Sequence, residues 1–198
     1  MGKENKSRYA VLGMLSLAPM SGYDLKKNIE ISTSNFWTES YGQIYPMLKQ
    51  LAEEGLTTSQ IEKKESRPER HVYTLTDKGW QALRAWLTEP VEYQLSRNEL
   101  LLKLFFGRQM QTPISAEHVQ KHRALQLQVL QHFDEIEAHL QANAAESPDL
   151  PYWLMTLSYG RHVAHALLAW CDETLITLNK LAEAEQTALS QAGSEEAR

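Results

Sequence analysis

Two short β-like runs stand in a sequence whose remaining pattern is helical. Residues 56–61 are rich in Thr and Ile, and residues 71–75 read His-Val-Tyr-Thr-Leu. The segment between them, residues 62–70, is charged and carries Pro68, as turn regions do. The two runs predict a β-hairpin with a basic end, and they limit the fold to a mainly α class with one small hairpin.

Helices are expected on both sides of the hairpin. Apolar residues at helical spacing predict a first helix over residues 7–18, which Pro19 ends. Ser21 and Asp24 have the spacing of a capping box, in which a serine hydroxyl and an acid three residues later satisfy free backbone N–H groups. They predict a second helix that runs to about Ile31.

A third and a fourth helix complete the first 90 residues. Ser40 and Gln43 give a similar start signal, and the apolar face of the third helix carries Ile44, Met47, Leu48 and Leu51. Gly55 suits a left-handed C-terminal cap for this helix. The fourth helix is expected from Thr76 to Pro90, with three large residues turned inward, which are Trp80, Leu83 and Leu87.

Residues 91–198 are helical throughout in pattern and are expected to form a second domain after residues 1–90. Residues 100–106 are apolar nearly all round, which predicts a well-buried helix. A heptad seam over residues 119–140 and a final helix that frays from Ser194 cannot easily close a core alone, so we expect a homodimer. The residues expected at the dimer contact are Val129, Phe133, Ile136, Leu140, Leu168, Leu175 and Leu178.

Composition excludes several classes of protein. No apolar run approaches the ~18 residues of a membrane helix, and the N-terminus has no signal-peptide pattern. One cysteine, Cys171, allows no intramolecular disulfide and fits a reducing cytoplasm. Phosphate-loop, His-Glu-x-x-His and Gly-x-Ser-x-Gly motifs do not occur, so neither an enzyme nor a cofactor is predicted.

The charge is distributed unevenly along the chain, whose net charge is −5. Residues 1–90 hold twelve Lys/Arg and eleven Asp/Glu, a net of +1, whereas residues 91–198 hold eight and fourteen, a net of −6. The total argues against nonspecific coating of nucleic acid, but it permits specific DNA binding by the first half, where basic residues cluster.

The order helix, helix, helix, hairpin, helix suits DNA reading, because a helix pair can present the third helix to the major groove while the hairpin reaches the flanking backbone. The candidates on the third helix are Ser40, Tyr41, Gln43, Tyr45 and Lys49, and Tyr23 begins the second helix. The candidates on the hairpin are Lys63, Lys64, Arg67 and Arg70.

Each candidate has a structural alternative. Gln43 could pair with adenine or only complete the capping box with Ser40. Tyr23 and Tyr45 could contact DNA or pack against the protein. The hairpin end could be a solvated turn, since its positive charge is diluted by three acids, which are Glu62, Glu65 and Glu69.

Two further groups of residues, the tryptophans and the histidines, could bind a ligand. Five tryptophans could line an effector pocket, but core or dimer packing is favoured for each of them. His118 and His122 lie one helical turn apart, as do His162 and His165, and this spacing can ligate a metal. Because no second cysteine completes a site, no metal is predicted.

Four blocks between residues 8 and 88 occur in order and with consistent spacing. They are Tyr9-x-x-Leu12-Gly13-x-Leu15, Ser21-Gly22-Tyr23-Asp24-Leu25, Gly42-Gln43-Ile44-Tyr45-Pro46-x-Leu48-x-x-Leu51-x-x-x-Gly55-Leu56 and Arg67-Pro68-x-Arg70-x-x-Tyr73-x-Leu75-Thr76-x-x-Gly79. Together they resemble the PadR family of bacterial transcription regulators. Residues 97–106 are similar to its longer subfamily, which has an α-helical C-terminal domain of the virulence-activator type. Ser21 departs from the histidine that the family often has there, but it can still cap the helix.

The resemblance implies a winged helix-turn-helix DNA-binding domain over residues 1–90 and a helical dimerisation domain over residues 91–198. It also implies a repressor that binds an inverted-repeat operator in double-stranded DNA and is relieved by a small molecule such as a phenolic acid. The alternatives are a winged helix that binds another protein instead of DNA and a metal-responsive sensor.

Overall fold

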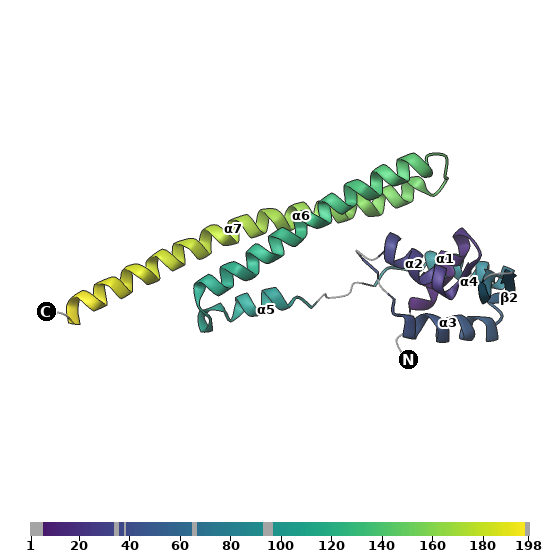
Figure 1. Ribbon diagram of the computed structural model, residues 1–198, viewed down its shortest axis with the longest axis horizontal. Helices are drawn as coiled ribbons and strands as arrows, with labels where there is room; N and C mark the ends of the chain where they lie inside the picture. Colours follow the sequence, from purple (N-terminus) through teal and green to yellow (C-terminus); the bar gives the residue numbers. More distant parts are fainter. Residues whose placement is uncertain (1–5, 34–35, 38, 65–66, 93–96, 197–198) are drawn as a thin grey trace. The chain divides into compact units, whose positions relative to one another are not determined.

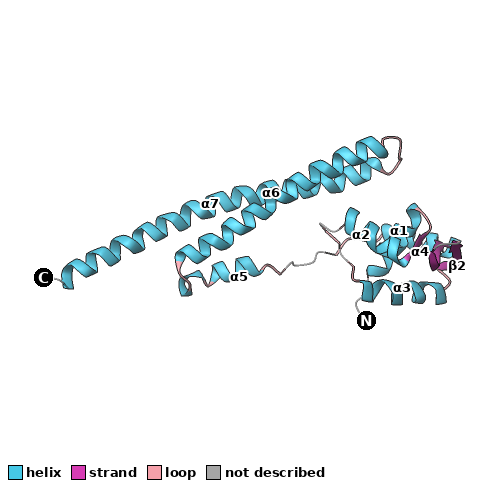
Figure 2. Cartoon of the chain, viewed as in Figure 1, coloured by secondary structure: helices cyan, strands magenta, loops and turns pink. Residues whose placement is uncertain are grey.

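The computed structural model describes residues 6–33, 36–37, 39–64, 67–92 and 97–196 (Figures 1 and 2). The chain divides into two compact units, Met1–Tyr93 and Gln94–Arg198. Helices make up most of the described residues, as the sequence predicts, and the strands lie in the first unit. Within the described part of the chain, no helix combines the length and the apolar character needed to cross a membrane.

The first unit is a winged helix-turn-helix domain. Its elements in chain order are α1 (Ser7–Leu17), β1 (Met20–Ser21), α2 (Gly22–Ser32), α3 (Tyr41–Glu53), β2 (Thr57–Lys64), β3 (Arg67–Leu75) and α4 (Asp77–Leu87). The strands form an antiparallel sheet in the order β1-β3-β2, with Met20 opposite Tyr73 and Thr57 opposite Leu75. The hairpin of β2 and β3 is the wing.

Local signals begin and end these helices as predicted. The Asp24 backbone N–H donates to the Ser21 hydroxyl at 3.2 Å, and the Ser21 N–H donates to the Asp24 carboxylate at 3.3 Å, so the capping box of α2 is confirmed. Thr76 caps α4 by accepting from the Gly79 N–H at 3.1 Å. Gly55 ends α3 at φ +72°, in the left-handed region that favours glycine.

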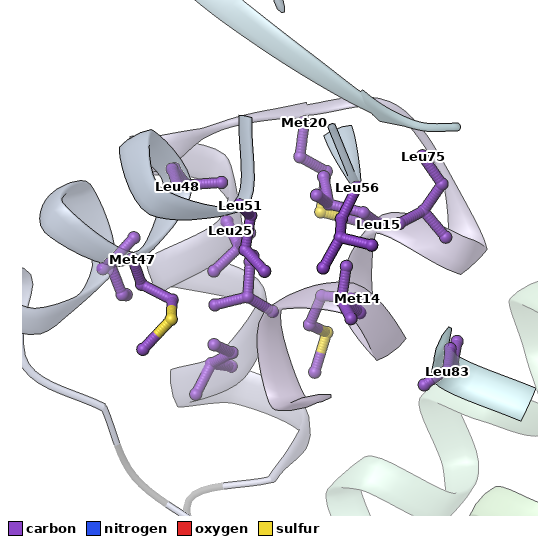
Figure 3. Packing of buried hydrophobic residues seen from close by; sticks show 14 residues of the cluster. Met14, Leu15, Met20, Leu25, Met47, Leu48, Leu51, Leu56, Leu75 and Leu83 are labelled. Carbon is purple, nitrogen blue, oxygen red and sulfur yellow. The ribbon is translucent and has the colours of Figure 1, made fainter. Parts of the chain in front are cut away.

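The core of the first unit lies where α1, α2 and α3 meet the base of the sheet (Figure 3). The four apolar residues predicted on one face of α3 are all buried: Ile44, Met47, Leu48 and Leu51. Leu12, Leu25 and Ile29 meet them from α1 and α2. This packing fixes α3 against α2 and leaves the opposite face of α3 exposed.

The structure corrects three predictions in the first unit. Strand β1 was not predicted, because two residues carry no periodic signal. The wing strands reach to Lys64 and from Arg67, so most of the charged segment 62–70 is strand and not tip. Leu87 was expected inside but is 66% exposed; α4 contacts the core through Leu83 and, in part, through Trp80 and Trp86.

The second unit contains α5 (Glu99–Phe105), the short 3-10 helix η1 (Gly107–Gln109), α6 (Thr112–Asn143) and α7 (Leu150–Glu196). The last two form a long antiparallel hairpin, which is plain in Figure 1. Helix α7 continues to Glu196, so the expected fraying from Ser194 is wrong.

Heptad spacing on both helices builds the contact between α6 and α7. Buried residues recur every seven positions on both helices, at Thr112, Val119, Gln126 and Phe133 on α6 and at Leu157, Ala164 and Cys171 on α7; Ser115 of α6 is buried as well. Because the two helices are antiparallel, the residue number falls on α7 as it rises on α6. Three polar pairs link the helices in this register. They are Thr112 with Glu185 at 2.7 Å, Arg123 with Asp172 at 2.6 Å and Arg161 with Asp134 at 2.7 Å.

Two expectations for the second unit need correction. The apolar helix at residues 100–106 was expected to be well buried, but α5 has no buried residue, and Phe105 is 82% exposed. Phe133, expected at a dimer contact, is only 3% exposed within the single chain and therefore serves the packing of α6 on α7. The wrong expectation for α5 has a physical cause. An apolar sequence indicates that a helix needs apolar contacts, but it does not indicate which element supplies them.

Candidate nucleic-acid interface

The outer face of α3 is the surface that the first unit offers to a groove. Packing of Ile44, Leu48 and Leu51 against α1 and α2 turns the other side of the helix to solvent. That exposed side carries Gly42, Gln43, Tyr45, Pro46, Lys49, Gln50 and Glu53. It combines amide, phenol and ammonium groups, which are side-chain types that read base edges and phosphates.

At the start of α3, Ser40 and Gln43 form the capping box that the sequence predicts. The Gln43 side-chain oxygen accepts from the Ser40 backbone N–H at 3.5 Å and from its hydroxyl at 3.2 Å. Both side chains are exposed. The capping role is therefore observed, and it uses the side-chain oxygen of Gln43.

Tyr45 occupies an intermediate position between packing and exposure. Its side chain is 51% exposed, yet its ring lies so close to the first residue of α2 that a Cβ added to Gly22 would be 2.6 Å from Cε1. The ring therefore packs over Gly22 with one side and faces solvent with the other. Tyr23, the next residue of α2, is exposed, so two phenol groups lie at the junction of α2 and α3.

Lys49 lies one turn beyond Tyr45 and is fully accessible to a phosphate. Its ammonium is 3.8 Å from the Glu53 carboxylate, one turn further along the same helix. An exposed pair at that distance contributes little stability, so DNA phosphates can displace it at small cost. The structure thus leaves Tyr23, Ser40, Gln43, Tyr45 and Lys49 exposed to solvent.

The wing carries the remaining candidates. The side chains of Lys63, Lys64 and Arg67, like that of Tyr41 on α3, lie outside the described residues. Arg70 was expected at the tip, but it lies within β3, opposite Glu62 of β2. Its Nε donates to Glu62 at 2.5 Å and its Nη1 to Asp24 at 3.3 Å.

Sequence reasoning missed the partners of Arg70. Glu62 was considered only as a charge that dilutes the wing, and Asp24 only as a helix cap. The hydrogen bond to Glu62, which outweighs partial desolvation, and the charges of both acids raise the pKa of Arg70. No local pattern could have revealed the pair with Asp24, since 46 residues separate the two side chains.

The structure also bears on metal and small-ligand sites. Among the residues that the structure describes, no three side chains of His, Cys, Asp or Glu come together where a metal ion could be held. A hollow of about 440 Å³ lies between α6 and α7, lined by Glu137, Leu154, Leu157, Ser158, Arg161, His162 and His165. Arg161 already pairs there with Asp134 at 2.7 Å and Glu137 at 2.5 Å.

A helix pair that exposes the polar face of its second member, beside a two-stranded wing, is the architecture of a winged-helix DNA-binding transcription regulator. Family models agree with this class. Residues 11–85 match the transcriptional regulator PadR-like family, and residues 96–179 match the model described as virulence activator alpha C-term. The chain is therefore a PadR-like family transcriptional regulator, and this is not a family of enzymes.

Individual proteins extend the likeness over nearly the whole chain. The negative transcriptional regulator PadR of Bacillus subtilis is 28% identical over 179 residues, which cover 87% of this chain and 97% of the relative. Its crystal structure with operator DNA superimposes with a TM-score of 0.78 at 26% identity, over 88% of this chain and 99% of that one. The Vibrio cholerae virulence activator AphA gives a TM-score of 0.69 at 28% identity, over 88% and 99% of the two chains.

Proposed function

We propose that this regulator is a homodimeric repressor that binds an inverted-repeat operator through α3 and the wing, and that a small aromatic effector releases it. The observation that carries the DNA contact is the exposed face of α3, where Gln43, Tyr45 and Lys49 stand on a helix whose other face is locked into the core. Two such helices in a symmetric dimer would enter major grooves about one turn of DNA apart, or a multiple of it.

The dimer is supported by apolar surface in the second unit. Helix α5 exposes Leu101, Leu102, Phe105 and Phe106. Six of the residues expected at the dimer contact are only half-buried by their own chain, which are Val129, Ile136, Leu140, Leu168, Leu175 and Leu178. Apolar side chains left exposed to water favour association with another apolar surface. A second copy supplies the required cover symmetrically.

Repression and its relief are supported by the Bacillus subtilis relative. That protein is a negative regulator by name, and one of its crystal structures contains p-coumaric acid, with a TM-score of 0.72 and 25% identity to this chain. The Vibrio cholerae relative is a virulence activator, so the direction of regulation needs its own test.

The first experiment selects DNA from a pool of genomic fragments with the purified full chain, at about physiological salt, where nonspecific binding is weak, with a Kd of about 10⁻⁴–10⁻⁶ M. We expect enrichment of an inverted repeat. Substitution of Gln43 or Lys49 by Ala should weaken binding to that repeat, with Lys49→Ala also lowering the salt dependence by about one counterion. Failure to enrich any sequence, with and without p-coumaric acid, would favour a protein-binding role for the winged helix.

The second experiment follows transcription in vitro from a promoter that overlaps the selected repeat. A repressor lowers the transcript level, and an aromatic effector restores it. We would titrate p-coumaric acid first, with benzoic acid as a control that lacks the phenol. An increase in transcript on adding the protein alone would overturn the repressor proposal and leave DNA binding intact.

A further inference from the structure

The outer part of the wing has little apolar support. The core takes Leu56 and Leu75 from the base of the wing, with Tyr73 packed against it in part. Strand β1 pairs with β3 only at Val72 and Tyr73. Beyond Val72, no described wing residue belongs to the core, so something other than apolar packing must set the direction of the outer wing.

Arg70 supplies a polar connection at this position. It lies two residues beyond the part of β3 that β1 holds, and directly opposite Glu62 in the ladder. One edge of its guanidinium donates to Glu62 at 2.5 Å, and Nη1 donates to Oδ2 of Asp24 at 3.3 Å. The planar fork of arginine suits two acceptors in this way, which a lysine ammonium does not.

The Asp24 oxygen that meets Arg70 also belongs to the cap of α2. Oδ2 accepts from the Ser21 hydroxyl at 2.7 Å and from the Ser21 backbone N–H at 3.3 Å. The cap therefore holds Asp24 in place independently of Arg70, and Asp24 gives the wing a fixed point at the start of α2. The wing and the helix pair share one carboxylate.

A hollow separates the two elements around this bridge. It has a volume of about 360 Å³ and is lined by Pro19, Asp24, Gln60, Ile61, Glu62, Arg70 and Val72. Across it, Arg70 reaches Glu62 and Asp24 by hydrogen bonds. The angle of the outer wing thus depends on the bridge more than on the core.

We propose that Arg70 is a positioning residue that ties the wing to the start of α2 through Glu62 and Asp24, and that it does not itself contact DNA. The tie sets where the basic end of the wing meets the flanking backbone relative to α3. Arg70 is 41% exposed, so its ion pairs add little to stability. Its effect is on operator affinity. The inference rests on the DNA-binding function proposed above.

The sign of the effect of Glu62→Gln tests the inference. If Arg70 contacted phosphate, removal of the neighbouring carboxylate would free the guanidinium and reduce repulsion, so binding would tighten. The tie predicts the opposite: Glu62→Gln and Arg70→Gln should each lower operator affinity by about threefold or more. The double variant should bind no more weakly than the weaker of the two single variants, because both substitutions break the same interaction.

Two controls separate positioning from charge and from folding. Glu69→Gln removes the same charge from the residue before Arg70 on β3, and should leave affinity unchanged or tighter. The second control is an operator duplex trimmed of the base pairs that flank the half-sites. The wing has no backbone to contact there, so Glu62→Gln and wild-type protein should bind it equally, whereas a poorly folded variant would be weaker on both duplexes.

The outcomes are distinct from those of the proposed function. Wild-type protein that binds no operator would refute the function. Wild-type protein that binds, together with a Glu62→Gln variant that binds as well or more tightly, would refute the tie. Additive losses in the double variant, or an equal deficit on the trimmed duplex, would also refute it.

Discussion

At Gly79, in the first turn of α4, the fold leaves no space for a side chain. A Cβ added there would lie 2.1 Å from the carbonyl oxygen of Leu56, which is backbone and cannot swing away. That carbonyl accepts from the Thr76 N–H at 3.1 Å and from its hydroxyl at 3.2 Å, so it is held at the junction of α3, the wing and α4. The glycine permits a close crossing of two chain segments.

Gly79→Ala should therefore lower the free energy of unfolding of the first unit by about 1–3 kcal/mol, the usual cost of overpacking. Gly13→Ala is the matched control, because nothing lies within 4 Å of a Cβ at Gly13 and alanine favours a helix by up to ~1 kcal/mol. The two substitutions should shift urea unfolding in opposite directions. Equal shifts would contradict the close approach at Gly79.

A second residue-scale prediction concerns Glu54, at the end of α3. Partial burial raises the pKa of Glu54, but hydrogen bonds from Gln50 and Arg8 and the charges of Arg8 and Lys78 outweigh it, so the pKa lies below the usual 4.5. A carboxylate with a lowered pKa stabilises the fold above its unfolded pKa, and this contribution disappears as the pH falls through the folded value.

Glu54→Gln should accordingly lower the free energy of unfolding at pH 7 by no more than about 1 kcal/mol, because the side chain is partly screened by solvent. The difference from wild-type protein should shrink as the pH falls below 4.5 and vanish once the pH is below the lowered pKa of Glu54 in the folded protein. Glu53→Gln, which removes an exposed carboxylate paired only loosely with Lys49, should show no such pH dependence. A difference that persists in acid would mean that Glu54 acts through packing.

At the scale of elements, the contact of α3 with the start of α2 decides where the recognition face lies. The Tyr45 ring packs over Gly22, and a Cβ at Gly22 would meet three atoms of that ring at 2.6–3.2 Å. A half-exposed ring can rotate outward, so the clash can be relieved without unfolding. We therefore expect a substitution at Gly22 to move the Tyr45 phenol and to leave the core intact.

Gly22→Ala should leave the free energy of unfolding within about 1 kcal/mol of wild-type protein, as a substitution that a surface side chain can absorb. It should weaken operator binding, because Tyr45 no longer lies at its position on the α3 face. In a Tyr45→Ala background the same change should have no further effect on affinity. Additive losses in the double variant would show that Gly22 acts independently of the ring.

At the scale of the whole molecule, the long hairpin of α6 and α7 closes its own seam, yet α5 is left uncovered. Leu102 and Phe105 are among the most exposed large apolar side chains of the second unit. We propose that a second copy of the chain covers this helix, because a symmetric contact uses the same surface of both copies. Dimerisation would also set the spacing of the two recognition helices.

Leu102→Asp combined with Phe105→Asp should convert the proposed dimer to a monomer and reduce operator affinity by tenfold or more, about 1.4 kcal/mol. Light scattering would report the mass, and circular dichroism would verify that helix content is kept. Wild-type protein that is monomeric at micromolar concentration would contradict the dimer. A dimeric double variant would place the interface elsewhere than α5.

Features that depend on residues within one or two helical turns could be predicted from the sequence. The capping boxes of Ser21 with Asp24 and of Ser40 with Gln43 were visible as spacings of three, and the left-handed cap at Gly55 as a glycine after an apolar helix. The buried face of α3 followed from helical periodicity. These signals are local, because a cap or a helix face is fixed by backbone geometry over a few residues.

Contacts between residues that are distant in the sequence became visible only in the folded chain. The tie from Arg70 to Asp24, the pairing of Met20 with Tyr73 and the closure of Phe133 into the α6–α7 seam join residues that lie far apart in the chain. Helical periodicity indicated that residues 100–106 need apolar contacts, but it did not indicate that the second unit leaves them exposed. Long-range contacts depend on how whole elements pack, and packing is a property of the assembled core that no short stretch of sequence contains.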